Sequence, residues 1–301
     1  MRSLSVVLLA AGTAAFLRPL APQRVTVALA AKRKKNKQIL SPSGEVLGGR
    51  PMMRASAIIG NRDRSSLVSA PWLKDNLNDL KLRILDVTQV LDRMGNTVSP
   101  GVDAYRAAHI PGARFVDVGR RLSTPNAKLH NMAPSPEQFA AELSRLGVDD
   151  ESHVVLYSSA KVMWATRVWW LLNSFGFASK VSVLDGGLTA WTAAGGGTAT
   201  FVPQNSTPTE LPVRPARRTA FVDKDAVLGA MKTDTMLIDT LKPSSFDGSK
   251  ASRYGRRGHI TSATNVPYES LLDDSGCFLP EEELRRALAA AGVGDEPVLA
   301  Y

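Results

Sequence analysis

The sequence predicts an α/β protein made of two copies of one unit, each a mainly parallel β-sheet flanked by helices. Strand-like and helix-like runs alternate along residues 66–301, which is typical of a parallel sheet covered on both faces. The same order of segments then occurs a second time. Between the copies lies a stretch rich in Gly, Pro, Thr and Ser, which indicates a linker.

Each copy begins with a short apolar strand that ends on an aspartate, RILDV around Asp86 and MLIDT around Asp239. We expect these aspartates to anchor the following loops rather than to act as acid–base groups. A histidine followed by isoleucine comes next, in HIPGA (His109) and HITSA (His259). Because both copies have it, we expect this histidine to position a turn. The second copy lacks the Pro and Gly of this turn, so we expect a weaker turn there.

A helix with proline in its first turn follows in each copy, starting near Pro136 and Pro280. Apolar residues recur at helical spacing and a glycine follows each helix, which is the expected stop signal. A short apolar strand comes next, HVVLY ending at Tyr157 and PVLAY ending at Tyr301. The repeat therefore predicts that these two tyrosines are equivalent.

The first copy continues beyond Tyr157 with SSAKVMW, a helix in ATRVWWLLNSFGF, the strand KVSVLDGG and then LTAW. Ligands of open α/β sheets bind at the carboxyl ends of the strands. A helix that starts there offers free N–H groups and positive partial charge, which suit an anion or a thiolate. We expect Arg167, on the tryptophan-rich helix, to pair with a carboxylate or carbonyls at the domain interface.

These motifs, HIPGA, RVWW and VLDGGLTAW in a tandem unit, resemble the two-domain rhodanese family of thiosulfate and 3-mercaptopyruvate sulfurtransferases. The resemblance implies two rhodanese-like domains, at residues 66–194 and 220–301, joined by a linker at residues 195–219. It implies a catalytically silent first domain and a cysteine in the strand-to-helix loop of the second. Such a cysteine takes sulfane sulfur from a small anionic donor, as a persulfide, and passes it to cyanide or a thiol. The resemblance implies no cofactor and no metal.

In the first copy Ser158 and Ser159 follow the strand, and in the second the matching position would follow Tyr301. We therefore expect a C-terminally truncated second domain, a catalytic cysteine beyond this chain, and no activity in the 301 residues alone. Cys277, the single cysteine, lies in DDSGCFLP and is expected to be a packing residue rather than the nucleophile. One cysteine also excludes an intramolecular disulfide and a thiolate metal cluster.

The donor is expected to bind arginines of the second domain, since a guanidinium fork suits carboxylate and sulfonate groups. By resemblance these are Arg253 and Arg257, in SKASRYGRRGHI. Ser245 stands where the family has another arginine. Asn131 and Gly119 stand where the mercaptopyruvate branch has a histidine and an acid. The donor therefore stays open. So does the alternative of a degenerate tandem rhodanese that binds an anion or a partner protein. A third alternative is a phosphatase, and the tandem layout argues against it.

Residues 1–64 hold 12 of the 37 basic residues and 2 of the 28 acidic ones, so the rest of the chain is nearly neutral. The net charge of +9 therefore indicates no nucleic-acid partner. An apolar run, Leu4–Phe16, is too short to span a bilayer and precedes a basic stretch with no acid before Glu45. This pattern resembles the bipartite leader of complex plastids, with a mitochondrial or secretory leader as the alternative. We expect a monomer without stable membrane insertion after processing.

Overall fold

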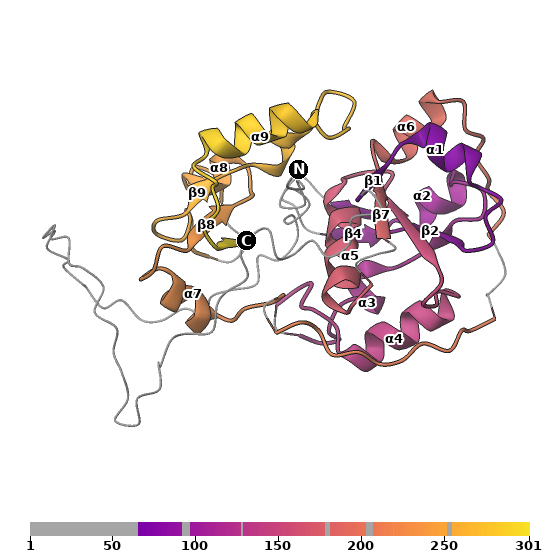
Figure 1. Ribbon diagram of the computed structural model, residues 1–301, viewed down its shortest axis with the longest axis horizontal. Helices are drawn as coiled ribbons and strands as arrows, with labels where there is room; N and C mark the ends of the chain where they lie inside the picture. The colour runs from indigo at the N-terminus through magenta and orange to yellow at the C-terminus, as the bar shows by residue number, and fades with distance from the viewer. Residues whose placement is uncertain are drawn as a thin grey trace, which may run out of the picture.

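The computed structural model describes residues 66–301 except residues 92–96, 128, 178–180, 203–206, 219 and 252–254. The leader expected at residues 1–64 lies outside the described residues. Figure 1 shows two bodies, a larger one from indigo to pink and a smaller one in orange and yellow. We call them the first unit, from β1 to α6 (67–193), and the second unit, from α7 to β10 (224–300).

The first unit is built on a five-stranded sheet in the order β1-β7-β6-β2-β5, in which every neighbouring pair is parallel. The strands are β1 (Leu67–Val68), β2 (Leu82–Asp86), β5 (Arg114–Phe115), β6 (His153–Tyr157) and β7 (Val181–Leu184). All five residues of β6 are buried, as expected for a central strand covered on both faces. An antiparallel pair, β3 (Gln89–Leu91) and β4 (Thr97–Pro100), follows β2.

Helices cover both faces of this sheet (Figure 1). They are α1 (Ala70–Asp75), α2 (Val102–Ala107), α3 (Val118–Arg121), α4 (Pro136–Arg145), α5 (Met163–Ser174) and α6 (Gly187–Ala193). Apolar residues of α1, α2 and α6 form one buried cluster with the sheet, and those of α3, α4 and α5 form another. The expected parallel sheet between two helical layers is therefore confirmed.

The second unit contains a three-stranded parallel sheet in the order β10-β8-β9. Its elements are α7 (Lys224–Ala230), β8 (Met236–Asp239), α8 (Pro243–Phe246), β9 (Thr264–Asn265), the 3₁₀ helix η3 (Tyr268–Leu271), α9 (Glu281–Ala290) and β10 (Val298–Ala300). A small core of Ile238, Val266, Leu271 and Leu284 joins the sheet to η3 and α9. The order β10-β8-β9 repeats the order β6-β2-β5 of the first unit.

Local sequence explains how the repeated helix starts and ends. Ser135 caps α4 by accepting the N–H of Gln138, and proline takes the first helical position. Glycines with positive φ follow the helix in both units, Gly147 at 69° and Gly292 at 82°. No helix within the described ranges is long and apolar enough to cross a lipid bilayer.

The stretch between the units lies against the first unit. Ala199 forms a β-bridge with His109, and the N–H of Arg217 donates to the carbonyl of Ser174 at 2.9 Å. Leu211 also packs on the core beside α4 and α5. The stretch whose composition indicates a linker therefore makes defined contacts with the first unit.

Candidate functional site

The carboxyl ends of the central strands are organised alike in the two units. The hydroxyl of Tyr157, which ends β6, accepts the N–H of Ile110 at 3.2 Å. The hydroxyl of Tyr301, which follows β10, accepts the N–H of Ile260 at 2.8 Å. Both tyrosines tie the end of a strand to the turn after the repeated histidine. The equivalence expected from the repeat is therefore present in side-chain contacts as well as in chain order.

Asp86 and Asp239 anchor the loops that follow their strands. Each carboxylate accepts the N–H two residues further on, from Thr88 at 2.9 Å and from Leu241 at 2.8 Å. Burial raises the pKa of both carboxyls, although these hydrogen bonds and the nearby tyrosine hydroxyls oppose the rise. The contacts support the expected anchoring role.

The two histidines hold the same position in both units. The Nδ1–H of His109 donates to the carbonyl of Tyr105 at 2.7 Å, and that of His259 donates to the carbonyl of Phe246 at 2.7 Å. Each ring stacks on the same residue, with centroids 4.0 Å and 3.6 Å apart. These contacts fix the segment before the turn, as expected of a structural residue.

The turn after each histidine closes with one backbone hydrogen bond. The bonds are Ala113 N–H to Ile110 O at 2.9 Å and Ala263 N–H to Ile260 O at 3.0 Å. Gly112 has φ of 79° and Ser262, at the same place in the second unit, has φ of 71°. The two turns share one geometry because Ser262 adopts the conformation of the glycine, and a weaker second turn stays a prediction. The cost is left-handed backbone strain at a residue with a Cβ atom.

In the first unit the strand runs into the loop Ser158–Val162 and then into α5. The N–H of Ser159 donates to Thr88 Oγ1 at 2.9 Å, and the Thr88 hydroxyl donates to Asp86 Oδ1 at 2.5 Å. The Ser158 hydroxyl accepts the N–H of Ala160 at 3.2 Å. Helix α5 begins without a side-chain cap. The loop is therefore rigidly tied to β2 and offers hydroxyl groups instead of a thiol.

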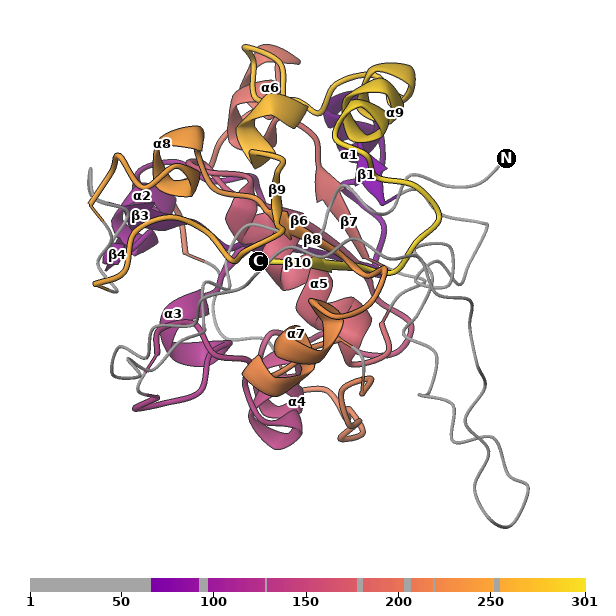
Figure 2. The same ribbon diagram turned by 90° about the vertical axis from the view of Figure 1, so that its left-hand side faces the viewer.

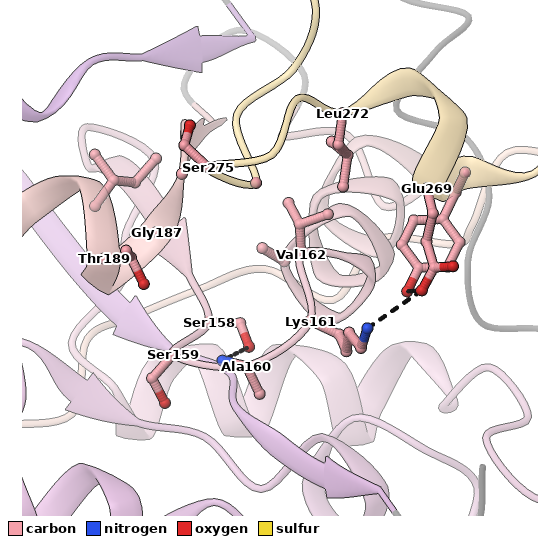
Figure 3. A pocket seen from close by; sticks show the side chains of 15 residues that line it. Ser158, Ser159, Ala160, Lys161, Val162, Gly187, Thr189, Glu269, Leu272 and Ser275 are labelled. Carbon is pink, nitrogen blue, oxygen red and sulfur yellow. Dashed lines mark hydrogen bonds and ion pairs between the residues drawn. The ribbon is translucent and has the colours of Figure 1, made fainter. Parts of the chain in front are cut away.

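This loop forms one wall of a cavity of about 170 Å³ between the two units. The start of α6 forms a second wall, and residues 268–276 of the second unit close it. Figure 3 shows Ser158, Val162, Thr189, Leu272 and Ser275 around the space. Figure 2, which looks from the side of the second unit, shows its chain in front of the first unit's sheet. The cavity therefore lies where ligands of parallel sheets bind.

An ion-pair cluster lies at the edge of the cavity. The Glu269 carboxylate pairs with Lys161 Nζ of the first unit at 3.2 Å and with Lys242 Nζ of the second at 3.0 Å. Burial opposes ionisation of Glu269, but the hydrogen bonds and charges of Lys242 and Lys161 together outweigh it and lower its pKa. The N–H of Phe278 donates to Asp185 Oδ1 at 2.8 Å. We call these contacts of residues 268–278 with the first unit the seam.

Cys277 lies in the seam. A Cβ atom built on Gly186 would lie 2.6 Å from its sulfur, so the thiol packs directly against the glycine before α6. Burial raises the pKa of Cys277, and the nearby Asp185 and Asp273 carboxylates raise it further. A nucleophilic thiol needs a lowered pKa. The expected packing role is therefore supported.

Arg167 is buried within the first unit. Its Nη2 donates to the carbonyl of Asn131 at 2.6 Å, and burial lowers its pKa to about 10. A carbonyl was one of the expected partners of Arg167. The expected place of this contact, the domain interface, is wrong, because Asn131 belongs to the first unit as Arg167 does. Asn131 has φ of 59°, so its carbonyl is turned to the guanidinium by a left-handed residue.

The arginines expected to bind the donor are not drawn together by described contacts. Arg253 lies outside the described residues, and Arg257 is exposed. Ser245 lies in α8 and Gly119 in α3. Arg257, Ser245 and Gly119 do not line the cavity.

Sequence reasoning missed Lys161 and Glu269, the charged residues at the cavity. A signal existed for Lys161, since a cation beside the start of α5 opposes the helix dipole and needs a counter-charge. Glu269 comes 108 residues later, and no pattern in the chain connects the two.

Comparison with known proteins agrees with this architecture. The profile of the rhodanese-like domain matches residues 69–194. The 3-mercaptopyruvate sulfurtransferase of Escherichia coli (strain K12) is 32% identical over 246 residues, covering 77% of this chain and 82% of the relative. The mitochondrial thiosulfate/3-mercaptopyruvate sulfurtransferase 1 of Arabidopsis thaliana is 30% identical over 263 residues, and the match spans 78% of this chain but 66% of that relative.

A solved structure gives the same result. The crystal structure of SseA from Escherichia coli superposes with a TM-score of 0.67 at 29% identity, covering 79% of this chain and 88% of that chain. The match extends across both units, since it covers far more of the chain than the first unit alone. The chain belongs to the rhodanese family, among the relatives of the thiosulfate and 3-mercaptopyruvate sulfurtransferases.

Proposed function

We propose that the complete protein is a sulfurtransferase. It moves sulfane sulfur from thiosulfate or 3-mercaptopyruvate to cyanide or a thiol through a cysteine persulfide. The observation that carries this proposal is the equivalence of Tyr301 with Tyr157, whose hydroxyls accept the N–H groups of Ile260 and Ile110. Directly after Tyr157 the chain forms a strand-to-helix loop at the ligand-binding edge of the sheet.

The nucleophile is a cysteine on residues that come after Tyr301 in the complete protein, at the position that Ser158 holds in the first unit. Its thiolate attacks the sulfane sulfur of the donor and forms a cysteine–sulfur bond. The donor's own bond to that sulfur breaks, so thiosulfate leaves as sulfite with the electron pair. The acceptor then attacks the outer sulfur of the persulfide and returns the cysteine to its thiolate.

The first unit, residues 66–194, is catalytically silent in this proposal. Ser158 and Ser159 offer hydroxyls in place of a thiolate, and their described hydrogen bonds go to the backbone and Thr88 rather than to a base. Residues 195–219 join it to the second domain, residues 220–301. The 301-residue chain, whose one thiol has a raised pKa, has no transferase activity by itself.

Arg253 and Arg257 bind the anionic group of the donor. Arg257 is exposed, so its guanidinium is accessible to a charged ligand. The carboxylate or sulfonate of the sulfur donor loses its hydrogen bonds to water on binding. A guanidinium group replaces them, because it presents a fork of N–H groups.

The test is cyanide-dependent thiocyanate release by the protein extended beyond Tyr301, with both donors. We expect activity in the extended protein, none in its loop Cys→Ser variant, and none in the 301-residue chain. Arg257→Met is expected to raise the KM of the donor about tenfold, whereas Arg285→Met, on the exposed face of α9, changes nothing. Turnover that survives in the Cys→Ser variant would overturn the mechanism.

A degenerate tandem rhodanese that binds an anion or a protein is the second candidate. Ser245, Gly119 and Asn131 favour it, because each stands where the sulfurtransferase pattern has a charged or ionisable residue. Donor binding without thiocyanate release by the extended protein would select this candidate.

Residues 1–64 are proposed to direct import into an organelle, a plastid or, as the alternative, a mitochondrion. The strong basic excess of this stretch supports a leader, and a relative from Arabidopsis thaliana is named mitochondrial. A fusion of residues 1–64 to a fluorescent protein, viewed beside markers of both organelles, decides between them. Fluorescence that stays in the cytosol would overturn the proposal.

A further inference from the structure

We propose that the cavity at the seam binds a small tetrahedral oxyanion, such as sulfate or thiosulfate, which competes with Glu269 for Lys161. This site lies between the units, beside the loop Ser158–Val162, and is independent of sulfur transfer at a loop after Tyr301. Its walls bring together an ammonium group, hydroxyl groups and the first turn of a long helix.

The first observation is a buried hydrogen-bond donor that points at the cavity. The Ser158 side chain lines it although the residue is only 7% exposed. Its oxygen accepts the N–H of Ala160, and its proton has no acceptor among the residues that the structure describes. Thr189 lines the same space from α6, and Ser275 lines it from the second unit, where its hydroxyl donates to Asp273 Oδ1 at 2.6 Å. A tetrahedral anion accepts hydrogen bonds from several sides at once and therefore suits a cavity lined by such polar residues.

The second observation is an uncompensated positive charge. Lys161 and Lys242 share one carboxylate, that of Glu269, so the cluster at the cavity keeps one net positive charge. Two carboxylates on segments that line the cavity, Asp185 and Asp273, do not line it themselves and accept the N–H groups of Phe278 and Ser275. The start of α5 has no side-chain cap and adds the positive end of the helix dipole, although the N–H of Trp164 donates to the carbonyl of Lys161 at 3.2 Å.

The size of the space agrees with this class of ligand. The cavity of about 170 Å³ holds an oxyanion of five heavy atoms together with a few waters, since a water takes about 30 Å³ of liquid volume. Val162 and Leu272 form an apolar part of its wall, which strengthens the attraction between an anion and the ammonium group.

Competition follows from the position of Lys161. Its ammonium group has three N–H donors and gives one to Glu269 at 3.2 Å, so an incoming anion shares the positive charge with that carboxylate and weakens the contact. Removing the Glu269 charge therefore strengthens anion binding, whereas removing the Lys161 charge weakens it. By reciprocity, a bound anion loosens this contact between the units.

The experiment titrates the 301-residue protein with sodium sulfate and with sodium thiosulfate by isothermal titration calorimetry, with chloride holding the ionic strength constant. We expect Lys161→Met to weaken binding of both anions roughly tenfold and Glu269→Gln to strengthen it several-fold. Lys81→Met is the matched control, because Lys81 is an exposed lysine of the first unit paired with Glu151 away from the cavity. It should bind like the parent.

Opposite shifts in the two variants are the signature of the site. Equal affinity in the parent, Lys161→Met and Glu269→Gln overturns the proposal, as does weaker binding in both variants. Far-ultraviolet circular dichroism checks that each variant is folded. If Lys161→Met fails to fold, Lys161→Arg keeps the charge and Glu269→Gln alone decides by the direction of its shift. No heat of binding in the parent at millimolar anion also overturns it.

Discussion

The loop Ser158–Val162 keeps its shape partly because Gly187 lets the chain pass close to it. Gly187, at the start of α6, has φ of 56°, and a Cβ atom there would lie 2.5 Å from the carbonyl oxygen of Ser158. Gly112 has φ of 79°, and a Cβ atom there would meet nothing within 4 Å. The two glycines share the backbone conformation but differ in the space around them.

Alanine at the two positions therefore separates strain from collision. Left-handed backbone costs an L-residue roughly 1–2 kcal/mol, and this cost applies to Gly112→Ala and to Gly187→Ala alike. Overpacking adds typically about 1–3 kcal/mol, and it applies to Gly187→Ala alone. We expect Gly187→Ala to lower the free energy of unfolding by about 1–3 kcal/mol more than Gly112→Ala does.

Urea unfolding followed by tryptophan fluorescence measures this difference. All five tryptophans lie between residues 72 and 191, so the signal reports the first unit. Equal destabilisation by the two substitutions would refute the reasoning, because it would mean that the loop yields to the new methyl group at no cost.

Three further outcomes depend on strain, burial and hydrogen bonding. Ser262→Gly should slow hydrogen exchange in the second unit, because glycine adopts φ of 71° with roughly 1–2 kcal/mol less strain; faster exchange would contradict this. Burial raises the pKa of Asp86, so the folded state binds this proton more tightly than the unfolded state does. The stability that the protonated Asp86 contributes is therefore fully present below the ordinary pKa of 3.8 and is lost as the pH rises above it. Asp86→Asn should therefore gain unfolding free energy relative to the parent between pH 4 and 7 in urea titrations, and a constant difference would contradict it. Arg167→Met should lower the urea midpoint of the first unit by removing the partner of the Asn131 carbonyl, at a cost of about 1–3 kcal/mol, and an unchanged midpoint would show that water replaces it.

The repeat made much of the fold predictable from the sequence. The strands that end at Asp86 and Asp239 and the helices near Pro136 and Pro280 lie where the pattern places them. These elements depend on local signals such as apolar periodicity, prolines and glycines. Tyr301 could be matched to Tyr157 for the same reason, because the interval from the proline is equal in the two copies.

The site was less predictable because its contacts join distant segments. Lys161 meets Glu269 only after both units have folded, and their separation of 108 residues leaves no local pattern. Ser262 shows a different limit, since hydrogen bonds around the turn impose a conformation that its own side chain disfavours. The burial expected of Arg167 predicts a carboxylate or carbonyl partner, but the choice of the Asn131 carbonyl depends on the left-handed backbone of that residue.

The seam also orders events during synthesis of the protein. Phe278, whose N–H meets Asp185, is made 93 residues later, a delay of about 5–20 s at ribosomal rates of 5–20 residues per second. During that interval the sheet of the first unit is complete, while the pocket beside Ser158 still lacks its lid of residues 268–276. A nascent chain therefore passes through a stage in which solutes reach Lys161 before Glu269 does, and a chaperone has the same opportunity.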